Sequence, residues 1–370
     1  MTLKIASLVA AAAAALASSA GAQTIVDLVG SSAGRSAVHN NIVSLLGGNA
    51  NVTYAYDGTS GQPTRATRAI YRGTYNGNSY IIRTYWEGSV NGVRDVQQQI
   101  QQTELIDLSV TGSLGGVFVA SPTKAPASAE TTPEIGFSDV FGTSTRFTAP
   151  TTEDEVAIIP FKWYRNVGSD AGVTNMTPLL VQQLFGSLGE LPVSMWTGNA
   201  DDQGITVFGI GRNDQSGTRI TAMAESGYSV FREVSQYTTV VDTGTITSLT
   251  FAGNGGFSSG SNIKSSVEST YSGGTVVGYL GASDWSTIAP ELTWNGVAYS
   301  QQNLYQGKYT FWGYLHMNTM LNTSSTSNLQ SVFFNALNTA IKAAPGSGLE
   351  PVGLMQVARD SDGGPVYPTF

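Results

Sequence analysis

One segment of the sequence combines an arginine, two hydroxyl residues and a glycine in an order suited to binding a small oxyanion. Arg212 is followed by residues 213–215 and then by Ser216-Gly217-Thr218. Arginine can hold two oxygens of an anion, hydroxyls donate hydrogen bonds, and glycine lets the backbone approach a ligand closely. The apolar run 205–211 predicts a strand before this segment, and the pattern of 219–225 predicts a helix after it. The segment therefore predicts an anion site at a helix start.

The same unit of strand, Gly/Ser/Thr turn and helix occurs elsewhere in the chain. Residues 24–29 predict a strand, 30–35 a turn and 36–46 a helix; a strand at 80–86 leads through 88–92 into a helix at about 93–102. The first N–H groups of such helices have no partner within the helix and carry the positive end of its dipole, so they suit an anion. Ser and Thr more commonly just cap helices, which is the structural reading of any single turn. Several such turns, one with an arginine, favour a shared site and an α/β fold.

A further strand end at 135–137 presents Ser138 and Asp139 at the carboxyl edge of the predicted sheet. A buried carboxylate repels an oxyanion unless the ligand brings a proton to share. Asp139 would therefore admit a protonated anion and reject a fully ionised one. Asp214 has two open interpretations, because it could orient Arg212 from behind or simply cap its own turn.

Composition limits the other classes. The 370 residues carry a net charge of −8 with 12% charged residues, which argues against a basic face for nucleic acid. The absence of Cys excludes disulfides, thiolate metal sites and lipid attachment through Cys, and the two His are far apart in sequence. We therefore expect no metal and no cofactor.

The N-terminus has the pattern of an export signal. Lys4 precedes an alanine-rich apolar run at 5–16, and Ala20-Gly21-Ala22 is a small-residue cleavage site. We expect residues 1–22 to be removed, leaving a periplasmic or secreted monomer without membrane insertion. The remaining length suits two lobes with a cleft between them. Residues 121–133 and 253–262, rich in Pro or in Gly, Ser and Asn, are expected to be surface loops.

These motifs resemble those of the periplasmic phosphate-binding proteins of ABC importers, which are type II substrate-binding proteins. Residues 212–218 resemble the family's Arg-x-Asp-x-Ser-Gly-Thr segment. Gly88-Ser89 is similar to its Gly-Ser-Gly loop with Val90 in place of the second Gly, and 135–139 is similar to its Gly-x-Ser-Asp element. The turn at 30–35 occupies the place of the family's first loop, but Gly34 and Arg35 replace the usual Thr and aromatic residue.

The resemblance implies an α/β, two-lobed type II periplasmic-binding-protein fold with a hinge and an inter-lobe cleft. Residues 23–157 would form the first lobe, 158–305 the second, and 306–370 would return to the first. It further implies a non-enzymatic protein that binds phosphate and delivers it to an ABC permease. The ligand residues it implies are Ser89, Asp139, Arg212, Ser216, Gly217 and Thr218, with Ser32, Ala33, Gly34, Ser138 and Asp214 as additional candidates.

Two alternative functions remain open on the sequence alone. Gly30-Ser31-Ser32-Ala33-Gly34 fits the G-x-S-x-G turn of a serine hydrolase, with Ser32 as nucleophile, Asp284 as acid and His316 as base. The same pattern recurs at 256–260, which weakens it. The low charge, the abundant Thr, Asn and Gly, and the 16 Tyr would also suit a surface or adhesive protein, although no internal repeat is present.

Overall fold

The computed structural model describes residues 23–126, 131–147, 150, 152–346 and 348–369. The predicted export signal at 1–22 lies outside the described residues. Within the described ranges, no helix is both long enough and apolar enough to cross a membrane.

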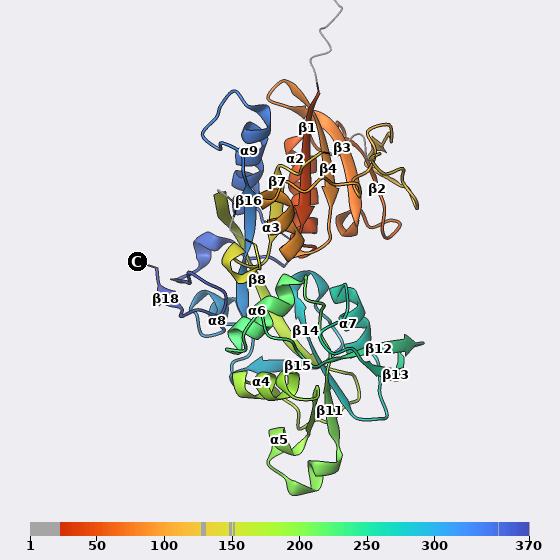
Figure 1. Ribbon diagram of the computed structural model, residues 1–370, viewed down its shortest axis with the longest axis vertical. Coiled ribbons are helices and arrows are strands. Elements are labelled where there is room, and N and C mark those ends of the chain that lie inside the picture. The colour runs from red at the N-terminus through yellow and green to blue at the C-terminus, as the bar shows by residue number, and fades with distance from the viewer. Residues whose placement is uncertain (1–22, 127–130, 148–149, 151, 347, 370) are drawn as a thin grey trace, which may run out of the picture.

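The elements alternate between strands and helices along most of the chain (Figure 1). The α-helices are α2 (Arg35–Leu45), α3 (Ser89–Gln97), α4 (Pro178–Gly186), α5 (Ser194–Thr197), α6 (Gly217–Glu225), α7 (Gly260–Val267), α8 (Gln301–Tyr305) and α9 (Leu329–Ala343). The strands are β1 (Thr24–Gly30), β2 (Thr53–Tyr56), β3 (Arg68–Tyr75), β4 (Asn78–Tyr85), β5 (Ser113–Leu114), β6 (Val117–Phe118), β7 (Ile135–Ser138), β8 (Thr152–Arg165), β9 (Asn175–Met176), β10 (Glu190–Pro192), β11 (Thr206–Gly209), β12 (Tyr237–Asp242), β13 (Thr245–Phe251), β14 (Thr275–Gly281), β15 (Glu291–Trp294), β16 (Trp312–Thr319), β17 (Val357–Ala358) and β18 (Tyr367–Pro368). Short 3₁₀ turns are η1 (Pro63–Arg65), η3 (Gly142–Ser144), η4 (Ala200–Gly204), η5 (Ala282–Asp284) and η6 (Val352–Leu354).

The strand β8 joins two lobes. Its first part pairs antiparallel with β16, up to the pair Pro160 and Trp312, and its second part pairs with β14, from Phe161 opposite Gly281 onward. One sheet path therefore runs β10-β11-β14-β8-β16-β7-β1-β4-β3-β2-β5 through both lobes. Figure 1 shows β8 and β16 between the upper lobe, lobe I, and the lower lobe, lobe II. The predicted two-lobed α/β fold is confirmed, whereas the boundaries at 157/158 and 305/306 stay predictions.

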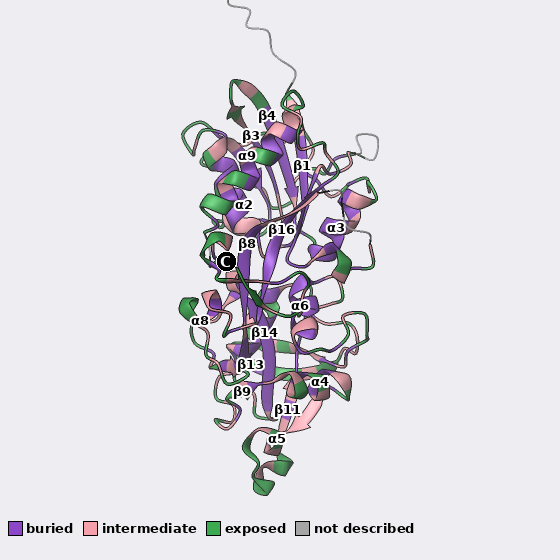
Figure 2. Ribbon diagram, turned by 90° about the vertical axis from the view of Figure 1, so that its left-hand side faces the viewer, coloured by how far each residue is buried: buried purple, intermediate pink, exposed green. Residues whose placement is uncertain are grey.

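Lobe I forms around a parallel core. β1 lies between β4 and β7 and is parallel to both, so the carboxyl ends of these three strands meet at one edge. Strands buried on both faces are expected to be continuously apolar, as 26–30 nearly are. Figure 2 shows α2 and α9 on one side of the buried strands and α3 on the other. The helices α2 and α3 begin at this edge, which faces lobe II.

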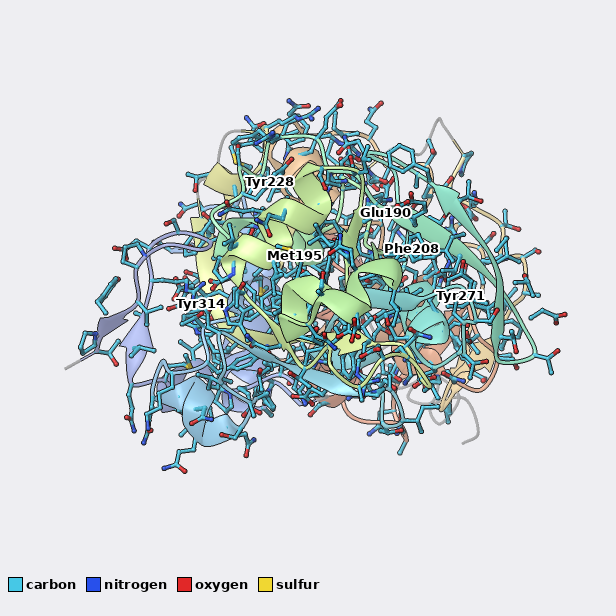
Figure 3. All side chains as sticks on the ribbon, turned by 90° about the horizontal axis from the view of Figure 1, so that it is seen from below. Glu190, Met195, Phe208, Tyr228, Tyr271 and Tyr314 are labelled. Carbon is cyan, nitrogen blue, oxygen red and sulfur yellow. The ribbon has the colours of Figure 1, made fainter. Side chains whose placement is uncertain are left out.

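Lobe II is built around aromatic packing. The indole of Trp163 on β8 stacks on Trp294, with ring centroids 6.4 Å apart, and on Phe311, at 5.7 Å. At the far end of this lobe, Glu190 and Phe208 are paired on neighbouring strands and Phe208 contacts Tyr271 (Figure 3). Large rings of this kind bury much apolar surface for each residue. They give the second lobe a rigid core of its own.

Residues 121–133 are not simply a surface loop. Lys124 pairs with Ile106, Thr131 pairs with Gln102, and Ala125 is buried. Residues 127–130 lie outside the described residues. The described parts of this segment therefore belong to the edge of lobe I.

A buried ion pair crosses two neighbouring strands of lobe I. The Arg83 guanidinium on β4 donates from Nε and Nη2 to the two carboxylate oxygens of Asp27 on β1, at 2.7 and 2.6 Å. Both side chains are almost fully buried. The two residues are also direct partners in the strand register. Removal of one partner would therefore leave a buried charge without compensation.

We expect Arg83→Met to lower the free energy of unfolding by about 3–5 kcal/mol, because Asp27 would stay buried and unpaired. The double variant Asp27→Leu/Arg83→Met should recover most of that loss, since neither charge then remains. Urea denaturation followed by circular dichroism measures both. Equal destabilisation in the single and double variants would contradict this account.

The C-terminal segment 349–369 contacts both lobes beside the hinge strands. Glu350 pairs with Ile158 on β8, and Arg359 forms a buried ion pair with Glu225 at the end of α6 in lobe II. On the lobe I side, the Asp362 carboxylate accepts a hydrogen bond of 2.9 Å from the Phe141 backbone N–H. Figure 1 shows β18 to the left of β8, at about the same height.

Burial raises the pKa of Asp362 from an ordinary 3.8 to about 7. Between these values the unfolded chain ionises this carboxyl while the folded chain keeps it protonated. Its contribution to stability is therefore full below about pH 4 and is lost as the pH rises through 7. Burial also raises the pKa of Glu134 and Glu155 to about 7, and these groups act in the same direction.

We therefore expect the protein to unfold at a lower temperature at pH 8 than at pH 5. Asp362→Asn, which can still accept from the Phe141 N–H, should reduce this difference. Differential scanning calorimetry at both pH values measures it, with the parent chain as the reference for the other carboxyls. An unchanged pH dependence in the variant would show that Asp362 is ionised in the folded protein at pH 5.

Candidate oxyanion site

A small cavity of about 10 Å³ lies between the lobes, where several helices begin. Ser32 and Ala33 precede α2, Thr218 lies in the first turn of α6, and Gly260 begins α7. The full lining is Ser32, Ala33, Arg212, Thr218, Gly260, Tyr279, Leu280, Gly281, Ser283 and Asp284. The sequence pattern predicts the helix starts near Ser32 and Thr218, whereas the start of α7 was not predicted. The cavity therefore has N–H groups and positive helix ends around it.

Arg212 supplies a buried positive charge to this cavity. Its side chain is held by backbone carbonyls, with Nε donating to Phe257 at 3.2 Å and Nη2 to Ser258 at 2.9 Å. The residue is 6% exposed, and no carboxylate of the described residues lies within 4 Å of the guanidinium. Burial lowers the pKa of Arg212, while Asp139 and Asp284 oppose this shift. An anion in the cavity would supply the missing countercharge.

Residues 253–262 were expected to be a surface loop, and that expectation holds only in part, because 260–262 begin α7 and Phe257 is buried. The carbonyls of Phe257 and Ser258 fix Arg212, and Asn254 accepts from the guanidinium of Arg219 at 2.8 Å. Ser259 caps α7, its Oγ accepting from the Ser261 N–H at 3.1 Å. Small residues are used here because the segment passes close to other backbone.

Asp139 lies at the end of β7 and is 1% exposed. Its Oδ2 accepts from the Thr218 hydroxyl at 3.3 Å, so the carboxylate of lobe I contacts the first turn of α6 in lobe II. Its Oδ1 is buried and has no hydrogen-bond partner among the described residues. Burial raises the pKa of Asp139, and Arg212, Ser31 and Thr218 lower it by smaller amounts. A buried carboxylate oxygen without a partner is destabilising, and a hydrogen-bond donor beside it would remove that cost.

The lobes are closed on each other at this point. A Cβ at Gly217 would overlap Asp139 Oδ1 and would lie 2.5 Å from Ser89 Oγ. The Val90 N–H on α3 also donates to the carbonyl of Gln215, at 3.4 Å. Only glycine at 217 allows this close approach. The contact places Ser89, Asp139, Gly217 and Thr218 in one cluster, of which Thr218 also lines the cavity. Their role as ligand residues stays a prediction.

Three other predicted site residues take part in local hydrogen bonds or packing. The Ser216 hydroxyl is the N-cap of α6 and accepts from the Arg219 N–H at 3.4 Å. The Ser138 hydroxyl donates to the carbonyl of Val140 at 2.7 Å. Gly34 packs against the side chain of Leu315 and is the N-cap of α2. None of these three lines the cavity.

Asp214 does not orient Arg212. It is exposed, and its carboxylate accepts from the side-chain amide of its neighbour Gln215 at 3.1 Å. Arg212 is held by carbonyls instead. The reason is that the turn before α6 directs residue 214 outward, so the residue that completes the resemblance in sequence has no contact with the arginine.

Sequence reasoning missed the contribution of Asp284 and Arg35. Asp284 lines the cavity from lobe II and forms an ion pair of 3.4 Å with Arg65 of lobe I. Arg35 is partly buried, and the charges of Asp284, Arg65 and Arg212 all act on its pKa. Burial lowers the pKa of Arg35, opposed by Asp284. The one signal in the sequence was that Arg35 stands where the resembled family has an aromatic residue.

The residues of a hydrolase triad are not joined. His316 lies fully buried on β16, and neither of its ring nitrogens has a hydrogen-bond partner among the described residues. Burial lowers the pKa of His316 to about 3. Asp284 pairs with Arg65, and the other histidine, His39, contacts the Tyr71 hydroxyl at 2.9 Å. In the described part of the chain, no base is in place to activate Ser32.

No protein-family model matches the chain, and no curated protein matches its sequence. Among solved structures, it is similar to a Clostridium perfringens protein described as a phosphate ABC transporter substrate-binding protein with bound phosphate, at 14% identity and a TM-score of 0.48, over 89% of this chain and 100% of that one. An ABC-type phosphate transport receptor from Vibrio cholerae is 12% identical with a TM-score of 0.46, over 86% of this chain and 95% of that one. PstS from Borrelia burgdorferi is 14% identical with a TM-score of 0.43, over 89% and 99%. Because the identities and TM-scores are low, the candidate site is argued from the contacts described above and not from these similarities.

We expect Gly217→Ala to prevent this closure, because the added methyl would overlap the Asp139 carboxylate and crowd Ser89. Small-angle X-ray scattering should then show a larger radius of gyration than for the parent. Gly204→Ala is a matched control, since nothing lies within 4 Å of a Cβ at that position. Equal compactness of the Gly217 variant and the parent would contradict the role assigned to this glycine.

Proposed function

We propose that this protein binds a protonated tetrahedral oxyanion, hydrogen phosphate, in the cavity between its lobes. The observation that carries the proposal is the presence of two opposite demands at the contact between the lobes, where Arg212 lines the cavity and Asp139 lies against Gly217 and Thr218 beside it. Arg212 is a buried cation without a carboxylate partner among the described residues, and Asp139 Oδ1 is a buried acceptor without a donor among them. A ligand that carries ionised oxygens as well as an O–H group meets both demands, since the oxygens bind Arg212 and the O–H donates to Asp139. Sulfate, which has no proton at neutral pH, meets only the first.

Each lobe supplies part of the donor set. Arg212, Thr218 and the Gly217 N–H would come from lobe II, and the start of α2 around Ser32 and Ala33, with Ser89 and Asp139, from lobe I. Ser216 and Ser138 would act by holding their turns, Gly34 by capping α2, and Asp214 would have no contact with the ligand. Because both lobes are needed, binding and closure would be coupled through bending of β8 and β16.

A location outside the cytoplasm is part of the proposal. The pattern of residues 1–22 supports export with cleavage after Ala22. We propose that the protein is a monomeric, periplasmic or secreted solute-binding protein, with residues 158–305 as its second lobe. It would deliver phosphate to an ABC permease and perform no catalysis. The resemblance of residues 212–218 to the phosphate-binding family supports this role.

Isothermal titration calorimetry tests the ligand. We expect phosphate to bind with a micromolar or lower dissociation constant and sulfate to give no heat. Arg212→Ala should weaken phosphate binding by at least about 100-fold, the loss of charge-assisted hydrogen bonds amounting to about 2.7 kcal/mol. Lys342→Ala removes a positive charge from an exposed position on α9 and serves as the control. If Arg212→Ala binds phosphate as well as Lys342→Ala does, the proposed site is wrong.

Asp139→Asn tests the choice of anion. The variant side chain can donate a hydrogen bond, so it no longer demands a proton from the ligand. We expect the preference for phosphate over sulfate to fall at least about tenfold, or about 1.4 kcal/mol, with measurable sulfate binding. Competition between the two anions in the same calorimeter measures the ratio. If the variant still prefers phosphate over sulfate to the same extent, a group other than Asp139 accepts the ligand's proton.

A further inference from the structure

A second pocket lies between the lobes, on the other side of the contact between α3 and α6. Lobe I contributes Arg94 and residues 144–147, and lobe II contributes residues 214–215, 219–220 and 230–232. It shares no lining residue with the oxyanion cavity. The two sites are nevertheless adjacent in the chain, because Thr218 lines one and Arg219 the other. The same first turn of α6 therefore serves both.

The pocket concentrates positive charge on an acidic protein. Four arginines line it, Arg94, Arg146, Arg219 and Arg232, against one carboxylate, Asp214. They are four of the 18 Lys and Arg residues of a chain whose net charge is −8. Arg94 is paired with Asp95 at 2.6 Å, but among the described residues no carboxylate lies within 4 Å of Arg146 or Arg232, and Arg219 is bound by the neutral Asn254. Like charges gathered in this way favour an anionic ligand.

The remainder of the lining is apolar. Val90 and Ile220 form part of the wall, and Phe231 beside them is 54% exposed. The Arg232 guanidinium lies over the ring of Tyr228, 5.0 Å from its centroid, which holds its charge at the pocket (Figure 3 labels Tyr228). The cavity measures about 160 Å³. That volume accommodates a ligand on the order of one benzene-sized ring.

We propose that this pocket binds a small organic anion that carries one ring, such as an aryl carboxylate, and that its occupancy holds the lobes closed. The wall formed by Arg146 belongs to lobe I and the wall formed by Arg232 to lobe II, so a ligand touching both binds the closed form better than an open one. The two affinities are then linked. If the organic anion raises the affinity of the oxyanion cavity for its ligand, that ligand raises the affinity of the second pocket for the organic anion by the same factor. The coupling rests on the proposed phosphate function, whereas binding of the organic anion does not.

Calorimetry with benzoate, on the chain from residue 23 onward and without phosphate, tests the pocket. We expect the double variant Arg146→Ala/Arg232→Ala to weaken benzoate binding at least tenfold, and Lys342→Ala to leave benzoate binding within about twofold of the parent. Benzyl alcohol, which has the ring without the charge, should bind at least tenfold more weakly than benzoate. If benzoate does not bind, binds equally to the double variant, or binds no better than benzyl alcohol, the pocket is not an anion site.

A second titration, with phosphate at saturating benzoate, tests the coupling. We expect phosphate affinity to rise at least about fivefold, within the usual range of coupling between sites. The double variant should lose this rise. Unchanged phosphate affinity with bound benzoate would overturn the coupling. Failure of phosphate to bind, with benzoate bound as expected, would instead overturn the proposed function and leave the pocket as a separate anion site.

Discussion

The interaction on which the site depends is the placement of a buried arginine charge at the junction of two lobes, with no carboxylate of the described residues within 4 Å of it. Carbonyls of Phe257 and Ser258 fix the Arg212 guanidinium, but carbonyl dipoles replace only part of the hydration that burial removes. Asp139 lies on the facing lobe, with one oxygen unpartnered among those residues. The charge and the acceptor are therefore compensated together only by something that occupies the space between the lobes.

The backbone makes this arrangement possible through the strand order. Because β1, β4 and β7 are parallel neighbours, their carboxyl ends present the starts of α2 and α3 and the Asp139 turn at one edge of lobe I. Lobe II presents the starts of α6 and α7 toward that edge. β8 and β16 carry both halves on two antiparallel strands, which can bend at the change of partner near Pro160 without breaking either core. The aromatic packing around Trp163 and the ion pair of Asp27 with Arg83 keep each lobe rigid during such a motion.

The sequence predicted the features that local pattern determines and missed those that depend on the approach of distant segments. The strand, turn and helix units around β1, β4 and β11 were predictable because apolar periodicity and Gly/Ser/Thr turns are encoded locally. The grouping of Gly217 with Asp139 was predictable only from the resemblance. Segment 253–262 was misinterpreted because a run of Gly, Ser and Asn looks alike whether it is a solvated linker or backbone packed beside an arginine. Asp214 was overvalued because spacing says nothing about which way a turn directs a side chain.

The closed arrangement also shows where the free energy of closure must come from. Closure buries Arg212 and Asp139, and burial shifts the pKa of each toward its neutral form, which means that closure without a ligand is opposed by desolvation. Among the contacts that favour closure directly are a partly exposed ion pair between Arg65 and Asp284, the hydrogen bond from Thr218 to Asp139, and backbone contact between α3 and the turn before α6, each of which is modest. A ligand that satisfies both buried groups reverses the largest opposing contribution, so its differential affinity for the closed form can exceed the sum of these contacts. Selectivity and closure are then the same property, because an anion that leaves Asp139 Oδ1 unpartnered cannot hold the lobes together.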